Sequence, residues 1–120
     1  MSLLAKWNNI DARWWIAAFW LAWCISTILM LLPAQDLPAV DIWDKAEHTG
    51  TFFTLMLLAA LGYYEKHSLQ RLALLLIAYG IAIECIQFFI PSRSFSVLDM
   101  VADSIGVLPA WWLITKIKLL

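Results

Sequence analysis

The sequence predicts an all-α fold, an integral membrane bundle of four transmembrane helices. Hydrophobic residues make up 63% of the 120 residues and charged residues 14%, whereas a soluble domain is about half apolar and about 25% charged. A membrane-spanning helix needs about 20 residues, so the chain holds about four spans and no separate soluble domain. The net charge is −1 and no stretch is strongly basic, which argues against nucleic acid as a partner.

The first two predicted spans are residues 14–32 and 46–64. The first contains no charged residue and is followed by Pro33; at about 1.5 Å per residue it is long enough to cross the hydrocarbon core. The second carries Glu47 and His48 in its first turn. We place these two side chains at the water boundary, because the apolar stretch that follows them is short for a complete span.

The other two predicted spans are residues 69–90 and 97–117. Pro91 ends the third span, because proline cannot continue a helix. Ser96 directly precedes the fourth span, and Asp99 lies three residues after Ser96. This is the spacing of a capping box at the N-terminus of a helix.

The basic residues predict how the bundle is oriented in its membrane. With four spans, the two chain ends and the middle connection share one side, which holds six of the eight basic residues: Lys6, Arg13, Lys66, Arg71, Lys116 and Lys118. The opposite side holds Lys45 and Arg93. The positive-inside rule then places both termini in the cytoplasm. We expect residues 1–13 to be a cytoplasmic segment and residues 14–120 to be a single membrane domain.

The acidic residues gather on the opposite, outer side. Seven of the nine map there: Asp36, Asp41, Asp44, Glu47, Glu84, Asp99 and Asp103. From the helical rise, Glu84 and Asp103 lie about 10 Å below the outer ends of their helices, at similar depth. An ionised side chain at mid-span costs about 2.5–3.5 kcal/mol, so such residues normally face the interior of the bundle and have partners there.

Helical spacing places polar residues of three spans on stripes that converge at the outer side, because positions three or four apart share one face of a helix. The predicted stripes are Asp44 with His48, Glu84 with Gln87 and Pro91, and Asp99 with Asp103, Gly106 and Ala110. We expect Arg93 to hang over them from the connection between the last two spans. The candidate pocket comprises Asp44, Lys45, His48, Glu84, Gln87, Arg93, Asp99 and Asp103.

Structural roles compete with functional roles at most of these positions. Asp99 can serve only as a helix cap. Gly106 and Ala110 form a pair of small residues that helix packing explains. His48 can be an interfacial residue held by the aspartate four residues before it, and Lys45 can extend to the lipid headgroups.

The pair Glu84 and Asp103 favours function over structure. Two carboxylates in a site of low dielectric do not both stay ionised comfortably, so we expect one of them to keep its proton, or both to share Arg93, Lys45 or a cation. Arg93, Lys45 and His48 together form a candidate clamp for an anion such as a lipid phosphate or a pyrophosphate.

Three motifs occur in order along the chain: Asp44-Lys45-x-x-His48, then Glu84-x-x-Gln87-x-x-x-Pro91-x-Arg93, then Asp99-x-x-x-Asp103-x-x-Gly106. From about Asp44 to Ala110 the chain resembles the VanZ-like family of small bacterial membrane proteins. Asp103 stands where that family commonly has Asn, which adds a negative charge, and Ala110 stands where a second Gly is frequent. The resemblance implies a multi-pass protein of the bacterial inner membrane, part of the cell envelope, associated with resistance to teicoplanin-type glycopeptides.

Two functions follow as alternatives. The first is binding without catalysis, in which the outward-facing pocket holds the headgroup of an anionic lipid or cell-wall precursor and affects glycopeptide susceptibility; the resemblance favours this function. The second is an integral-membrane enzyme, a hydrolase or phosphoryl transferase acting on a lipid through Glu84, His48 and Asp103.

The sequence assigns neither a catalytic residue nor a cofactor. It contains no nucleophile motif and no tight metal signature, so we predict no metal site, although the carboxylates with His48 are compatible with a divalent cation. A transporter is less expected, because four spans line a path only as a dimer or larger assembly. The sequence is compatible with an oligomer.

Overall fold

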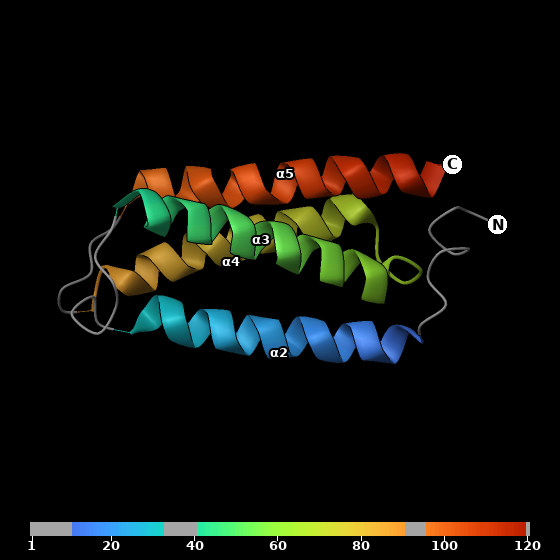
Figure 1. Ribbon diagram of the computed structural model, residues 1–120, viewed down its shortest axis with the longest axis horizontal. Helices are drawn as coiled ribbons and strands as arrows, with labels where there is room; N and C mark the ends of the chain where they lie inside the picture. The colour runs from blue at the N-terminus through green and yellow to red at the C-terminus, as the bar shows by residue number, and fades with distance from the viewer. Residues whose placement is uncertain (1–10, 33–40, 91–95, 120) are drawn as a thin grey trace.

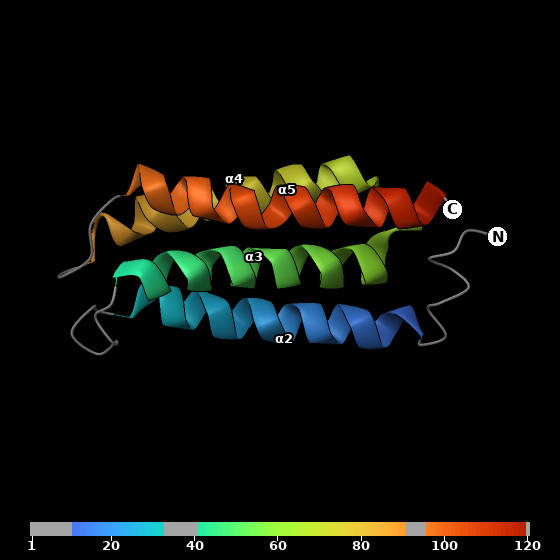
Figure 2. The same cartoon turned by 45° about the horizontal axis from the view of Figure 1, so that its top comes forward.

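Four α-helices run side by side in alternating directions (Figures 1 and 2). The computed structural model describes residues 11–32, 41–90 and 96–119, with side chains at 11–32, 45–90 and 96–117. The helices are α2 (Ala12–Leu31), α3 (Asp41–Tyr63), α4 (Leu69–Gln87) and α5 (Val97–Leu119). Because no strand occurs in these described ranges, the predicted all-α fold of four helices is confirmed.

Polar side chains cap the beginnings of three helices. A cap satisfies one of the backbone N–H groups that have no partner inside the first turn. The N–H donors and their acceptors are Arg13 to Asp11 Oδ1 at 3.1 Å, Arg71 to Ser68 Oγ at 3.1 Å, and Asp99 to Ser96 Oγ at 3.2 Å. The last of these confirms the predicted cap at Ser96.

α3 and α4 begin or end at other residues than the predicted spans, because an apolar stretch and a helix need not have the same ends. α3 begins at Asp41, five residues before the predicted span, because apolarity marks the membrane boundary and polar turns can continue the helix beyond it. α4 ends at Gln87, three residues before predicted. The N–H of Phe88 still bonds four residues back, to Glu84, whereas those of Phe89 and Ile90 bond three residues back, a tighter turn that commonly closes a helix.

Three of the described helices, α2, α4 and α5, are long and apolar enough to cross a membrane. α3 does not meet the same criterion, because its first turns carry Lys45, Glu47 and His48. α3 nevertheless has more contact with the other helices than any of them has: it packs mainly against α5 and α2 and less against α4, and Phe52, Leu55 and Met56 on it are completely buried. Its place is at the centre of the bundle, surrounded by the more apolar helices.

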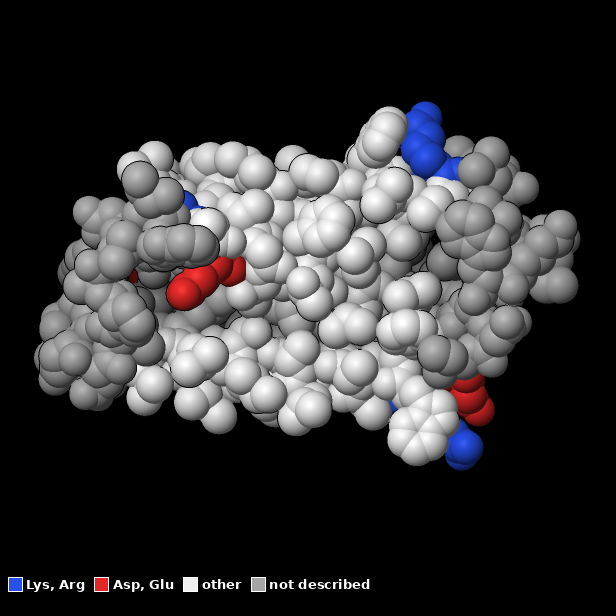
Figure 3. All heavy atoms as spheres, viewed as in Figure 1, with Lys and Arg blue, Asp and Glu red and all other residues white. Residues whose placement is uncertain are grey.

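The outside of the bundle is apolar. Large hydrophobic side chains are exposed on α2, α4 and α5, among them Ile28, Leu74 and Leu98, each more than 60% exposed. On the face in Figure 3 the middle of the molecule is white, and acidic and basic atoms appear only towards its two ends. Contiguous exposed apolar surface of this extent fits a lipid environment.

The two ends of the bundle differ in charge. At one end, which we call the basic end, α2 begins, α3 meets α4 and α5 finishes (Figure 1). The described basic residues there are Arg13, Lys66, Arg71 and Lys116. At the other end, which we call the polar end, α3 and α5 begin and α2 and α4 finish. The assignment of the basic end to the cytoplasm stays a prediction.

Small residues let α3 and α5 approach closely. A Cβ added at Gly106 would collide with the backbone oxygen of Thr49, and Ala110, one turn further along α5, is completely buried. The Thr49 hydroxyl also donates a hydrogen bond to the Ala102 carbonyl at 3.0 Å. This close packing brings the start of α5 against the start of α3.

Candidate functional site

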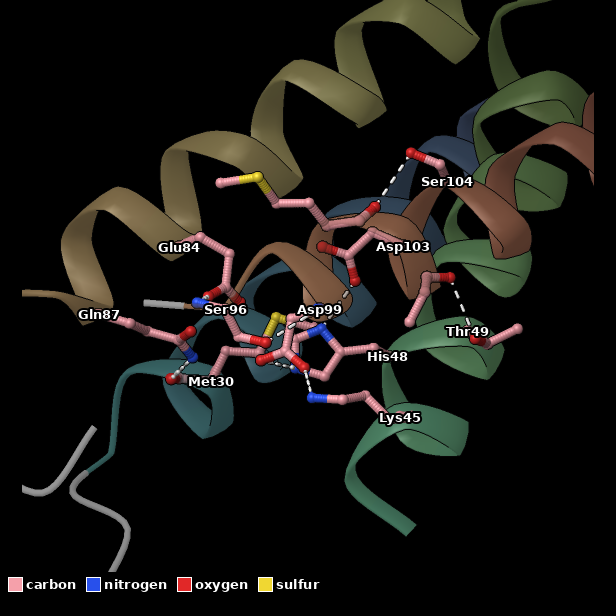
Figure 4. A network of polar contacts seen from close by, with 12 residues as sticks. Met30, Lys45, His48, Thr49, Glu84, Gln87, Ser96, Asp99, Asp103 and Ser104 are labelled. Atoms are coloured by element: carbon pink, nitrogen blue, oxygen red, sulfur yellow. Dashed lines mark hydrogen bonds and ion pairs between the residues drawn. The ribbon is translucent and has the colours of Figure 1, made fainter. Parts of the chain in front are cut away.

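The polar end encloses a cluster of charged and amide side chains from three helices (Figure 4). In the part of the chain that the structure describes, the buried polar or charged residues are His48, Glu84, Gln87, Asp99 and Asp103, each at most 7% exposed. Lys45, whose side chain is 39% exposed, pairs with Asp99 at the edge of the cluster. We call Lys45, His48, Glu84, Asp99 and Asp103 the polar site.

His48 and Asp103 form a buried pair at the centre of the polar site. His48 Nδ1 lies 2.7 Å from Asp103 Oδ1. Because an ionised carboxylate only accepts hydrogen bonds, Nδ1 is the donor. This fixes the ring so that Nε2 faces Asp99, whose Oδ2 lies 3.8 Å away. The expected partner of His48, Asp44, has its side chain outside the described residues, and Asp103 on α5 holds the ring.

Asp103 fits into the bundle because α4 has a glycine opposite it. A Cβ at Gly80 would lie 2.7 Å from Asp103 Oδ2. Gly80 precedes Glu84 by four residues and so lies on the same face of α4. This spacing was visible in the sequence, but the prediction did not include Gly80.

Glu84 contacts the start of α5 rather than Asp103. Its side chain is completely buried, and Oε2 accepts the backbone N–H of Ser96 at 3.0 Å. The expectation that depth pairs Glu84 with Asp103 is therefore wrong in detail: Asp103 lies one turn deeper, against Gly80. Oε1 of Glu84 is buried and has no hydrogen-bond partner among the described residues.

The contact between Glu84 and Ser96 changes the role of Asp99. In a complete capping box the Asp99 carboxylate would accept the Ser96 N–H, but Glu84 takes that position. The Asp99 carboxylate instead forms an ion pair with Lys45 through Oδ1 and faces His48 through Oδ2. Asp99 is therefore more than a cap.

Gln87 belongs to the helix packing and not to the polar site. Its Nε2 donates a hydrogen bond of 2.6 Å to the backbone oxygen of Met30 in the last turn of α2. Carbonyl groups at the end of a helix have no partner inside it, so Gln87 satisfies one of them. Arg93 of the predicted pocket and Pro91 of the predicted stripe lie outside the described residues.

The described polar site carries an excess of negative charge. Three carboxylates stand against one ammonium, which leaves a formal charge of −2 while His48 is neutral. The predicted anion clamp has two of its members, Lys45 and His48, paired with Asp99 and Asp103. An anion entering this site therefore meets carboxylates as well as cations.

A shallow groove lies beside the polar site on the outside of the bundle, with a volume of about 580 Å³. It runs between α3 and α5 and is lined mostly by apolar residues, including Leu98, Val101 and Ile105. Lys45 and Gly50 contribute to it from α3. We call it the α3–α5 groove; Lys45 belongs both to it and to the polar site.

Comparison with known families finds one that matches the chain. The sequence model of the VanZ/LLP1 family matches residues 3–119, nearly the whole chain. The chain belongs to the VanZ/LLP1 family. No curated protein and no solved structure matches the chain.

The VanZ/LLP1 membership confirms the family resemblance, and the structure shows where its motif residues lie. The histidine of the first motif, the glutamate of the second and both aspartates of the third meet in the polar site. In this VanZ/LLP1 protein the residue expected to be Asn is Asp103, and its carboxylate is the group that orients His48.

Proposed function

We propose that this VanZ/LLP1 protein binds the phosphate-bearing headgroup of an anionic lipid, or of a lipid-linked cell-wall precursor, at the polar end. The α3–α5 groove is the observation that carries the proposal. It offers an apolar surface to a lipid chain and contains Lys45, the ammonium that also pairs with Asp99 of the polar site. A lipid lying in the groove would place its headgroup at the polar site.

Lys45 supports the assignment to an anionic headgroup. Its side chain is partly exposed, so the ammonium can reach a phosphate at the membrane surface while its methylene stem covers apolar atoms. A basic residue near the headgroup region contributes about 1 kcal/mol to the binding of anionic lipid. The apolar groove supplies a second contribution, of about 0.8 kcal/mol for each methylene group of the lipid that it buries.

The polar end would face the outside of the bacterial cytoplasmic membrane, because the basic residues gather at the other end. A protein that shields a precursor headgroup there would change the access of glycopeptide antibiotics to that precursor.

The orientation is tested with the variant Glu47→Cys, made in a chain in which Cys24 and Cys85 are replaced by serine. A membrane-impermeant maleimide added to intact cells should label it; labelling only after lysis would reverse the orientation.

Filling the groove tests the proposal. A Cβ added at Gly50 meets no atom within 4 Å, and Gly50 lines the groove, so Gly50→Leu has room to extend from α3 into the groove. Native mass spectrometry of the purified protein with phosphatidylglycerol should then show several-fold less bound lipid. Ala78→Leu, on an exposed face of α4, is the control and should retain it. Equal lipid binding by wild type and Gly50→Leu would contradict the proposal.

A second function, hydrolysis of the bound lipid, is favoured by the contact of His48 with Asp103. A histidine whose Nδ1–H is held by a buried carboxylate presents Nε2 as a general base. In this reaction Nε2 takes a proton from water, the water oxygen bonds to phosphorus, and the ester P–O bond breaks with protonation of the leaving oxygen.

Turnover separates this reaction from binding alone. Purified protein mixed with phosphatidylglycerol or a polyprenyl pyrophosphate should release a headgroup or phosphate detectable by mass spectrometry. His48→Gln should lower the rate at least 100-fold, whereas His67→Gln, at the exposed basic end, should leave it unchanged. Absence of product from either lipid would leave binding as the function.

A further inference from the structure

We propose that His48, Glu84 and Asp99 hold one divalent transition-metal ion, Zn²⁺ or Mn²⁺, at the polar end. Each residue comes from a different helix, and each offers one ligand atom. These three atoms lie within 4.8 Å of one another. Ligands at about 2.0–2.2 Å from one ion are separated by about 3–4 Å, so a small closure of the three side chains completes the site.

The orientation of His48 is the first independent support. Its Nδ1–H is committed to Asp103 at 2.7 Å, which leaves the Nε2 lone pair on the side of Asp99. A histidine that binds a metal commonly donates its other N–H to a carboxylate in this way. Asp103 is thus a positioning residue, one step removed from the ion.

The state of Glu84 is the second support. Its side chain is completely buried, and Oε1 has no hydrogen-bond partner in the part of the chain that the structure describes. Oε2 is anchored by the Ser96 N–H, so the carboxylate is held in place. A buried carboxylate oxygen without a hydrogen bond is costly, and coordination to a cation removes that cost.

The charge of the polar site is the third support. With every carboxylate ionised and His48 neutral, its three carboxylates and one ammonium have a formal charge of −2, which one divalent ion cancels. Ionised groups inside a membrane protein normally pair with compensating charge. One imidazole and two carboxylates are ligands that suit Zn²⁺ and Mn²⁺, whereas sites for Mg²⁺ and Ca²⁺ are usually built from oxygen alone.

An ion with three protein ligands keeps coordination positions open. Phosphate oxygens of a bound headgroup are suitable ligands for these open positions. The ion would also offset the negative charge of the polar site, which otherwise repels an incoming phosphate. This last step rests on the proposed function; binding of the metal does not. Coordination through His48 Nε2 also excludes that atom as the general base of a hydrolase.

Metal titration without lipid tests the site. Protein stripped with a chelator in detergent should bind about one Zn²⁺ or Mn²⁺ per chain by calorimetry, with a higher melting temperature. Glu84→Gln should weaken binding at least tenfold, and Asp103→Asn by about 10–100-fold through His48. Glu47→Gln removes an exposed acid from α3 outside the trio and should bind like wild type. Equal affinity of Glu84→Gln and wild type would overturn the proposal.

Two further readouts separate the metal site from folding and from the proposed function. Circular dichroism in excess chelator shows whether each variant is folded, and pulsed electron paramagnetic resonance of bound Mn²⁺ should detect one imidazole nitrogen that His48→Gln removes. Phosphatidylglycerol is then titrated with and without Zn²⁺. Metal binding without lipid binding supports the site and contradicts the proposed function. Lipid binding by a chain that binds no metal supports the proposed function and contradicts the metal site.

Discussion

Asp103 and Gly80 constrain one another across two helices. The carboxylate occupies space that a side chain at position 80 would fill, since a Cβ there would lie 2.7 Å from Oδ2. Asp103 in turn holds Nδ1 of His48 on a third helix. The direction in which His48 presents Nε2 therefore depends on a glycine of a different helix.

Gly80→Ala should disturb the polar site and destabilise the protein. Replacing glycine by alanine inside a helix normally adds about 1 kcal/mol of stability, but crowding a packed site costs about 1–3 kcal/mol. We expect a net loss of about 1 kcal/mol in unfolding by sodium dodecyl sulfate. Gly50→Ala, where a Cβ meets open space, is the matched control and should stabilise. Equal stabilisation by both changes would show that the contact with Asp103 is unimportant.

The members of the polar site could be predicted from the sequence, but most of their pairings could not. Helical period and alternating helix direction bring His48, Glu84, Asp99 and Asp103 to one end of the bundle. The pairings depend on side-chain reach and on helix rotation, which spacing does not determine. For this reason Glu84, and not Asp99, accepts the Ser96 N–H.

At the scale of the helices, Gln87 joins α4 to α2. Its amide donates to the Met30 carbonyl in the last turn of α2, and Met30 is itself buried. α2 packs mainly on α3 and has less contact with α4. The hydrogen bond therefore fixes the end of α2 beside the polar site without adding a ligand to it.

Gln87→Leu should lower stability without changing the polar site. The change leaves the Met30 carbonyl without this donor, which costs about 1 kcal/mol in unfolding experiments. Zinc affinity should stay within about twofold of wild type by calorimetry, because Gln87 is not a ligand. Gln70→Leu, on an exposed face of α4, should change neither quantity. A large loss of zinc affinity in Gln87→Leu would show that Gln87 belongs to the polar site.

The ends of a helix could be predicted from the sequence where they coincide with the ends of an apolar stretch. The start of α5 at Val97 was predicted because Ser96 caps it, and a cap is a local signal. The prediction put Asp44 and His48 on one helical stripe but began the membrane span at residue 46; α3 extends further, to Asp41, since a packed helix can continue past the apolar run. Pro109 lies inside α5, which is tolerated in membrane helices where other groups satisfy the freed carbonyl.

On the scale of the whole molecule, an apolar belt separates two ends of different chemistry. The basic end carries exposed Lys and Arg, whereas the polar end encloses carboxylates between α3, α4 and α5. The low charged fraction of 14% predicted the belt, because few residues remain to interrupt it. The α3–α5 groove was not predicted, since it arises from the packing of two helices.

The most direct test of headgroup binding compares two lysines at opposite ends of the bundle. Lys45 lies at the groove and the polar site, whereas Lys116 stacks over Trp112 at the basic end. A basic residue near the headgroup region contributes about 1 kcal/mol, or about fivefold in affinity. Phosphatidylglycerol affinity should therefore fall about fivefold in Lys45→Gln and stay unchanged in Lys116→Gln. Equal affinities in wild type and both variants would contradict headgroup binding at the polar end.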